Sequence, residues 1–160
     1  MKALPVPQAF CGVTPYLIVR DAAKALEFYT QAFGAKETMR IDGPEGKIGH
    51  AEMHLGSGAF MLADENPGMG FLSPEALGGA GVSLMFYVDD VDAQVATAVA
   101  AGAKLMRPVQ DQFYGDRSGL LTDPFGHVWT IATHIEDMTH EELLRRAAEM
   151  MKQMCGEEKK

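Results

Sequence analysis

The stretch YLIVRDAAKALEFYTQAFGAK, residues 16–36, occurs a second time in altered form as MFYVDDVDAQVATAVAAGAK, residues 85–104. Asp21 of the first copy matches Asp90 of the second at an offset of 69 residues, and the closing Gly-Ala-Lys segments match at an offset of 68. Each copy reads as a short β-rich run, an Asp that can cap a helix, a helix, and a glycine that ends it. The sequence therefore predicts one structural unit used twice.

A second pair of similar segments extends the repeat. Residues 58–62, GAFML, and residues 126–130, GHVWT, are also 68 positions apart. Short runs with alternating or β-branched residues, separated by Gly- and Pro-rich turns, predict three further strands after each helix. We expect an α+β fold made of two βαβββ modules, residues 12–64 and 81–134, whose curved mixed sheets surround a cleft.

The length of 160 residues suits a single domain, 1–160, with a core large enough for independent folding. Between the two modules, residues 65–80 are rich in Gly and Pro and are typical of a mobile linker or flap. After the second module, a capping-box pattern followed by an apolar stripe predicts a C-terminal helix over residues 138–155. We expect this helix to act as a lid or as a strut in a dimer.

The overall charge limits the range of partners. The formal net charge is -8 and the pI is near 5.0, so no basic stripe is available to neutralise nucleic-acid phosphates or an anionic membrane surface. No apolar run reaches the roughly 18–20 residues that span a bilayer, and the first ten residues lack the layout of a signal peptide. These features favour a cytoplasmic protein that binds neither nucleic acid nor membrane.

Three motifs occur in a fixed order around the repeats: V-x-D at residues 19–21, F-Y-x-x-x-F-G at residues 28–34, and D-P-x-G at residues 123–126. With the duplicated βαβββ pattern, this combination resembles the vicinal oxygen chelate superfamily. Its members include glyoxalase I, extradiol dioxygenases, fosfomycin-resistance transferases and bleomycin-resistance proteins. The resemblance covers about residues 12–134 and implies that the modules enclose a ligand cleft, often within a dimer.

Enzymes of that superfamily usually hold a divalent metal on the first and last strands of each half. Matched by motif, these positions are Thr14 and Ser83 on the first strands, and Leu62 and Thr130 on the last strands. Hydroxyls and a leucine cannot replace the imidazole and carboxylate donors that such metals need. A shift of one residue along any of these strands supplies no donor either. The sequence thus predicts no metal and no other cofactor.

His50, Glu52 and His54 alternate along one predicted strand and therefore share a face. They are candidates for a displaced metal site, or for a catalytic acid and base. Against a metal site, alternate residues of one strand lie about 6.6 Å apart and rarely converge on one ion unaided. The alternative is a polar cleft wall or a solvated strand face.

Arg117 follows the segment Phe113-Tyr114-Gly115-Asp116, at the entrance to a predicted strand. One interpretation is a clamp for an anion or a carbonyl group, since a guanidinium group can donate two parallel hydrogen bonds. The other interpretation is a surface ion pair with Asp116. Both remain open from the sequence. His134 and the other histidines near it occupy strand ends and turns, where we expect no chemistry.

An apolar, partly aromatic wall is predicted for the cleft. Such a wall with few polar groups suits a flat or hydrophobic ligand. Each residue could instead pack the core between the modules. The predicted ligand-binding set comprises Thr14, Tyr16, Phe60, Leu62, Ser83, Met85, Tyr87, Arg117 and Thr130.

These patterns favour a metal-independent binding protein that resembles bleomycin-resistance proteins and sequesters or carries a small organic molecule, aromatic or cationic, as a homodimer. Antibiotic resistance is one function that this resemblance implies. The alternative is an enzyme of the same fold, a lyase, isomerase or dioxygenase, with its site at His50, Glu52 and His54. A third hypothesis is an interaction module driven by the C-terminal helix.

Overall fold

A computed structural model describes residues 5–7, 10 and 12–157, with side chains of the C-terminal helix described through residue 153. The predicted single-domain range, 1–160, extends beyond the described residues at both ends. The first module consists of β1 (Tyr16–Val19), α1 (Ala22–Phe33), β2 (Lys36–Asp42), a 3₁₀ turn η1 (Pro44–Gly46), β3 (Ile48–Leu55) and β4 (Gly58–Asp64). The second consists of β5 (Ser83–Tyr87), α3 (Val91–Ala100), β6 (Lys104–Asp111), β7 (Asp116–Thr122) and β8 (Val128–His134).

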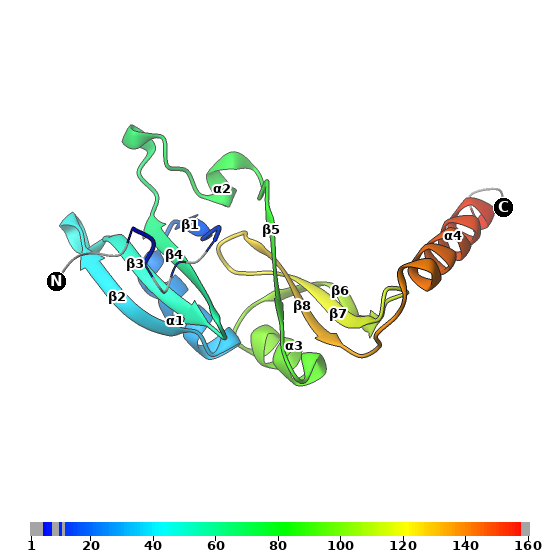
Figure 1. The fold of residues 1–160 in the computed structure, drawn as a ribbon. Coiled ribbons are helices and arrows are strands. Elements are labelled where there is room, and N and C mark those ends of the chain that lie inside the picture. The colour runs from blue at the N-terminus through cyan, green and yellow to red at the C-terminus, as the bar shows by residue number, and fades with distance from the viewer. Residues whose placement is uncertain (1–4, 8–9, 11, 158–160) are drawn as a thin grey trace.

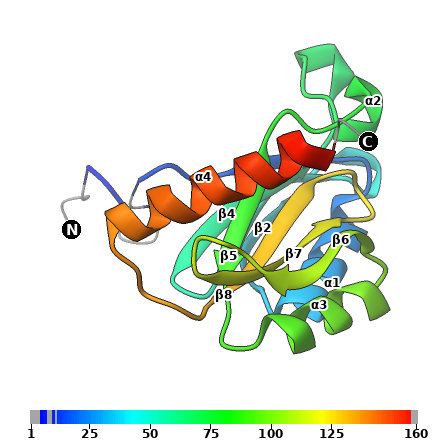
Figure 2. The ribbon, with the colours of Figure 1, turned by 90° about the vertical axis from the view of Figure 1, so that its right-hand side faces the viewer.

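Each module forms a mixed four-stranded sheet, in the order β1-β4-β3-β2 and β5-β8-β7-β6. The first strand pairs with the last in parallel, and the remaining neighbours are antiparallel. The two sheets stand beside each other, while α1 and α3 pack together along one side of them (Figures 1 and 2). The predicted α+β fold with two βαβββ modules is confirmed.

The helix boundaries follow from the predicted capping residues. Asp21 accepts a hydrogen bond from the Lys24 backbone N–H at 3.1 Å, and Asp90 accepts one from Ala93 at 3.0 Å. Gly34 ends α1 with φ 69°, a left-handed conformation that favours glycine. Local signals thus define both helices in the way that the repeat predicts.

Equivalent positions also secure the start of each helix to the last strand of its sheet. In the first module, Asp64 accepts hydrogen bonds from the N–H groups of Ala22, at 3.0 Å, and Ile48, at 2.7 Å. In the second, the Thr133 hydroxyl accepts from the N–H of Val91 at 2.9 Å. Asp64 and Thr133 are 69 residues apart, which is also the offset between the two capping aspartates.

One aromatic cluster joins the modules. The ring of Phe33, at the end of α1, lies 4.9 Å from that of Trp129 on β8, centroid to centroid. Beside it, the buried Asp123 carboxylate accepts hydrogen bonds from the Tyr29 hydroxyl at 2.7 Å and the Trp129 indole N–H at 2.8 Å. Burial raises the pKa of Tyr29 well above its ordinary value, and the neighbouring Asp123 adds to the effect. The two modules therefore share one core.

The segment between the modules, expected to be a linker or flap, contains local structure. It forms a 3₁₀ turn η2 at Pro67–Met69 and the short helix α2 at Pro74–Leu77. Arg20, which follows β1, pairs with Glu65 at 3.4 Å and with Glu75 at 3.0 Å. These ion pairs connect the segment to the first module.

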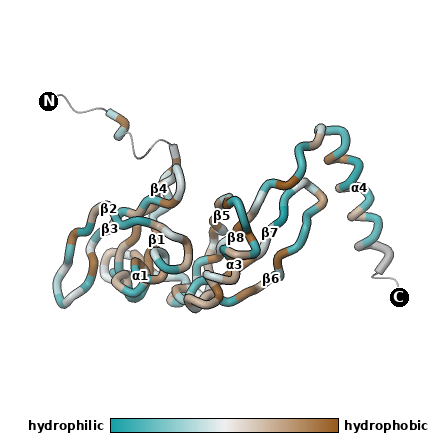
Figure 3. Tube along the Cα trace, turned by 90° about the horizontal axis from the view of Figure 1, so that it is seen from below, coloured by the Kyte–Doolittle hydropathy of each residue, from teal (hydrophilic) through white to brown (hydrophobic). Residues whose placement is uncertain are grey.

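The C-terminal helix α4, His140–Glu157, extends away from both sheets (Figures 1 and 3). Its start is fixed by Thr139, whose hydroxyl accepts a hydrogen bond from the Glu142 N–H, and by an ion pair of Arg146 with Glu136 at 2.7 Å. None of the helices in the described part of the chain is both long and apolar enough to cross a bilayer.

Candidate functional site

A groove of about 500 Å³ runs between the two modules, along β1 and β5. Both strands are at the edge of their sheets, so the groove separates two free strand edges. The segment between the modules supplies one wall. The groove is lined by Val13, Pro15, Tyr16, Leu17, Ile18, Leu72, Pro74, Leu77, Gly79, Ala80, Gly81, Val82, Leu84 and His127.

The chemistry of this groove is predominantly apolar. Tyr16 and His127 are the side chains with polar groups among those that line it, and the His127 Nε2 atom lies 3.1 Å from the Ile18 carbonyl oxygen. A cavity of about 140 Å³ adjoins it and shares Pro15 and Leu84. A concave apolar site of this size with few polar groups is typical of small-molecule sites.

Tyr16 also belongs to a chain of polar side chains on the first sheet. We call the side of each sheet that faces away from α1 and α3 its open face. On this face the Tyr16 hydroxyl lies 2.7 Å from Nδ1 of His50, and Nε2 of His50 lies 3.5 Å from a Glu52 carboxylate oxygen. Partial burial raises the pKa of Tyr16. His54 shares the face, and among the described residues it makes no hydrogen bond or ion pair with the other three.

The open face of the second sheet carries a different series of contacting polar side chains. They lie where β5 and β8 end and β7 begins. The Tyr87 hydroxyl donates to the buried Asp116 carboxylate at 2.7 Å, and His134 Nδ1 lies 2.8 Å from the other oxygen of Asp116. His134 Nε2 lies 3.0 Å from Asp137. The hydrogen bonds to Asp116 and then to Asp137 raise the pKa of His134. The hydrogen bond to Asp116, together with burial, raises the pKa of Tyr87 to about 12.

The predicted facing of β4 is wrong. Phe60 and Leu62 were expected beside Tyr16, but they are 4% and 0% exposed and lie in the core. In the strand register Tyr16 pairs with Met61, and in the second sheet Met85 pairs with Thr130. Because paired residues share a face, Met61 occupies the position of the first module that Thr130 occupies in the second.

The positions that correspond to the metal ligands of related enzymes provide no suitable donors. Thr14 precedes β1, Ser83 begins β5, and Met61 and Thr130 are on the last strands. Hydroxyl and thioether groups do not match the imidazole and carboxylate set of such sites. Among the residues that the structure describes, no group of three or more His, Cys, Asp or Glu could hold a metal ion. His50, Glu52 and His54 are not brought together as such a group in the described part of the chain.

Arg117 has other partners than those the sequence suggested. Its guanidinium group makes two hydrogen bonds to Asp92, at 2.7 and 2.9 Å, and one to Asp111 at 2.7 Å. Of the two interpretations left open by the sequence, the ion pair with Asp116 is wrong, because neighbouring residues of a strand point to opposite faces. Two carboxylates already occupy the guanidinium group, so the geometry gives it no role in the groove.

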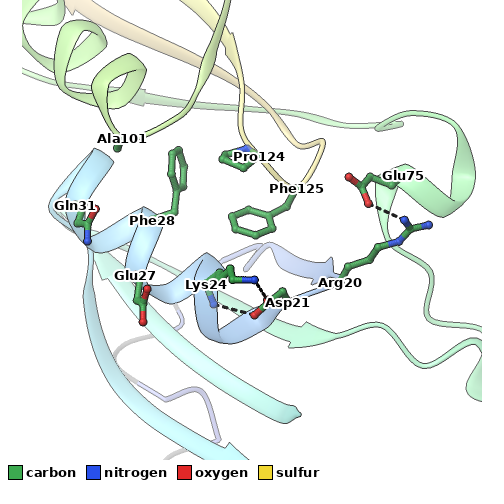
Figure 4. Close-up of a pocket in the computed structure, with 10 residues that line it drawn as sticks. All are labelled: Arg20, Asp21, Lys24, Glu27, Phe28, Gln31, Glu75, Ala101, Pro124 and Phe125. Atoms are coloured by element: carbon green, nitrogen blue, oxygen red, sulfur yellow. Dashed lines mark hydrogen bonds and ion pairs between the residues drawn. The ribbon is translucent and has the colours of Figure 1, made fainter. Parts of the chain in front are cut away.

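A second hollow, of about 430 Å³, lies beside α1 (Figure 4). Both cations that line it are already paired: Arg20 with Glu75 at 3.0 Å, and Lys24 with Asp21 at 2.7 Å. This hollow is more open and more polar than the groove between β1 and β5, which we therefore take as the candidate site.

Sequence reasoning brought together some of the residues at these sites and missed others. Tyr16 lies in the groove, whereas Phe60 and Met85 line the adjoining cavity. The wall formed by residues 72–82 was not foreseen, although its apolar residues within a Gly- and Pro-rich stretch were a usable signal. The contact of Asp116 with Tyr87 and His134 depends on long-range packing and had no local signal.

Comparisons with known proteins agree with this architecture. Residues 11–131 match the family model described as the Glyoxalase/Bleomycin resistance protein/Dioxygenase superfamily. An uncharacterized protein of Mycobacterium tuberculosis is 39% identical over 135 residues, which is 82% of this chain and 79% of that protein.

Solved structures show the same arrangement of elements. TioX from Micromonospora sp. ML1 has a TM-score of 0.61 at 27% identity, covering 81% of this chain and all of that one. The fosfomycin resistance protein FosX from Listeria monocytogenes has a TM-score of 0.58 at 18% identity, covering 84% of this chain and 98% of that one. At that identity the likeness to FosX concerns the fold alone.

Proposed function

Because the chain belongs to the glyoxalase/bleomycin resistance protein/dioxygenase superfamily, we propose that it is a metal-independent binding protein for a small organic molecule. The observation that carries the proposal is the apolar groove of about 500 Å³ between β1 and β5. Binding there, in the cytoplasm, would sequester or carry the ligand, as in resistance to a toxic compound.

The lining supports an aromatic or otherwise flat apolar ligand. Pro15, Leu72, Leu77 and Leu84 can bury the ligand's apolar surface, which is the main source of affinity in such a groove. The net charge of -8 favours a neutral or cationic compound over an anion.

A thermal-shift screen of small aromatic and cationic compounds tests the proposal, since a ligand that binds the folded protein raises Tm. Leu77, which is 65% exposed in the groove wall, should lose contact with the ligand in the Leu77→Ala variant, raising Kd about fivefold. The matched control is Leu144→Ala on α4, where an exposed leucine lies outside the groove. Equal affinities of the two variants for every compound found would contradict binding in the groove.

We also infer a homodimer. Both open faces expose large apolar residues, among them Ile41 and Met39 in the first module and Met85 and Tyr87 in the second. Contact between such faces would remove this surface from water. Light scattering after size exclusion should give twice the chain mass, and Ile41→Glu should shift the protein towards the monomer. A monomer at all concentrations would refute this inference.

The contacts of His50 with Tyr16 and with Glu52 favour one alternative, an isomerase or lyase with an acid–base site. Under this alternative a bound compound is converted, and His50→Gln slows the conversion while leaving binding nearly unchanged. Recovery of every bound compound unaltered after long incubation would instead favour the binding protein.

A further inference from the structure

Tyr16 belongs to both the groove and the polar chain on the open face. It lines the groove between β1 and β5, and its hydroxyl lies 2.7 Å from Nδ1 of His50. The residue remains 47% exposed, so a bound molecule can reach it. Whatever determines the direction of the Tyr16–His50 hydrogen bond therefore also determines what the hydroxyl offers to a ligand.

Glu52 favours one direction. Its carboxylate lies 3.5 Å from Nε2 of His50, an ion-pair distance, and its negative charge favours the neutral tautomer that carries hydrogen on Nε2. The Nδ1 atom of that neutral tautomer carries a lone pair and accepts. Tyr16 must then donate its hydroxyl hydrogen to His50.

The other neighbours of His50 leave this arrangement unchanged. Ile41, which pairs with His50 on β2, is apolar. The charged or titratable groups on the same face are Glu52, Tyr16, His54 and Lys36, and Lys36 pairs with His54 at the start of β2, away from His50. The raised pKa of Tyr16, caused by burial, keeps its hydroxyl protonated. With its hydrogen committed to His50, the hydroxyl presents only lone pairs to the groove.

We propose that Tyr16 makes the groove selective for ligands that carry an N–H or O–H donor next to an apolar or aromatic body. This inference rests on the proposed binding function and specifies its ligand class. His127 does not compete for this role, because its Nε2 atom already faces the Ile18 carbonyl. A ligand that offers only acceptors would instead face the lone pairs of Tyr16 and leave them without a hydrogen bond.

Indole and benzofuran test the inference as a matched pair, because they have nearly the same shape and differ in one N–H donor. At about pH 8, where ordinary imidazoles are neutral, wild-type protein should bind indole about tenfold more tightly than benzofuran, measured by calorimetry. Tyr16→Phe should reduce the ratio to about one, mainly by weakening indole binding. Tyr114→Phe is the matched control, since Tyr114 lies outside the groove, and it should keep the ratio.

The outcomes separate the inference from the proposed function. If neither compound binds, the proposed groove function fails for small aromatic ligands and this inference fails with it. If both bind with equal affinity to wild-type protein, or if Tyr16→Phe keeps the preference, the inference alone is overturned.

One further measurement tests the direction of the hydrogen bond. Nitrogen-15 NMR of the His50 ring should find the proton on Nε2 at about pH 8, and a proton on Nδ1 would overturn the inference.

Discussion

The two modules share their scaffold and differ on their open faces. In the first sheet, one row across the open face reads Tyr16, Met61 and Glu52, and in the second the corresponding row reads Met85, Thr130 and Leu120. The residues that start the helices correspond between the modules, Asp21 with Asp90 and Asp64 with Thr133. The residues that a ligand or a partner would meet do not.

This difference shows which positions the fold constrains. A position that satisfies a helix terminus must supply a hydrogen-bond acceptor in both copies, as Asp64 and Thr133 do with different groups, because an unpaired buried N–H destabilises the protein. An open-face position has no such constraint. The series of contacts from Tyr16 to His50 to Glu52 occurs on the open face of the first module and has no equivalent at the same positions of the second.

The largest effect is expected where one module depends on the other. Asp123→Ala leaves the Tyr29 hydroxyl, the Trp129 indole N–H and two backbone N–H groups without their acceptor in the core. The free energy of unfolding should fall by about 3–5 kcal/mol, measured by urea denaturation.

Tyr29→Phe serves as the milder variant if Asp123→Ala does not fold. It removes one of these hydrogen bonds and keeps the ring, so the expected loss is about 1 kcal/mol. If Asp123→Ala lowered the free energy of unfolding by less than the about 1 kcal/mol expected for Tyr29→Phe, the carboxylate would not hold the modules together.

A second prediction compares equivalent positions directly. Asp64→Ala removes the acceptor of two backbone N–H groups. Thr133→Val removes the acceptor of one, together with the donor to the Val88 carbonyl. The expected losses in the free energy of unfolding are about 2 and about 1 kcal/mol, because an exposed carbonyl can bind water in place of the hydroxyl. Equal losses would mean that the Ile48 N–H finds water in Asp64→Ala, or that the Val88 carbonyl finds none in Thr133→Val.

The third prediction concerns pH and applies to the second module only. The carboxylates beside His134 raise its pKa, so the stability that it contributes is complete below the pKa of an unfolded histidine and is lost as pH rises through the folded pKa. His134→Gln should therefore lower Tm most at about pH 5.5 and least at about pH 9. A difference in Tm between wild-type protein and His134→Gln that widens as pH rises would contradict the ion pairs of His134.

Much of the fold could be predicted because its signals are local. Asp21, Asp90 and Gly34 act within a few residues of their own position, and the alternation of apolar residues identified most of the strands. The packing of Phe33 against Trp129 in the other module had no local signal. It depends on how the two modules meet in space.

The error on β4 has a simple cause. Leu55 pairs with Gly58 across a two-residue turn, whereas Asp123 donates its N–H to the His127 carbonyl across three residues. The longer turn returns the offset between equivalent residues of the two modules from 68 to 69. The matching glycines at 58 and 126, which are 68 residues apart, are therefore not equivalent. Because side chains alternate along a strand, an error of one residue moved Phe60 and Leu62 to the wrong face.

The smallest effect is expected at Arg117, which the sequence placed among the ligand contacts. Its partners Asp92 and Asp111 are exposed, and exposed ion pairs contribute little to stability. Arg117→Gln should lower Tm only slightly and leave Kd for a groove ligand within about twofold of the wild-type value. Tyr16→Phe supplies the contrasting case for a donor ligand such as indole. If Arg117→Gln weakened binding more than Tyr16→Phe, the ligand would have to lie on the second module, and the asymmetry of the two faces would be reversed.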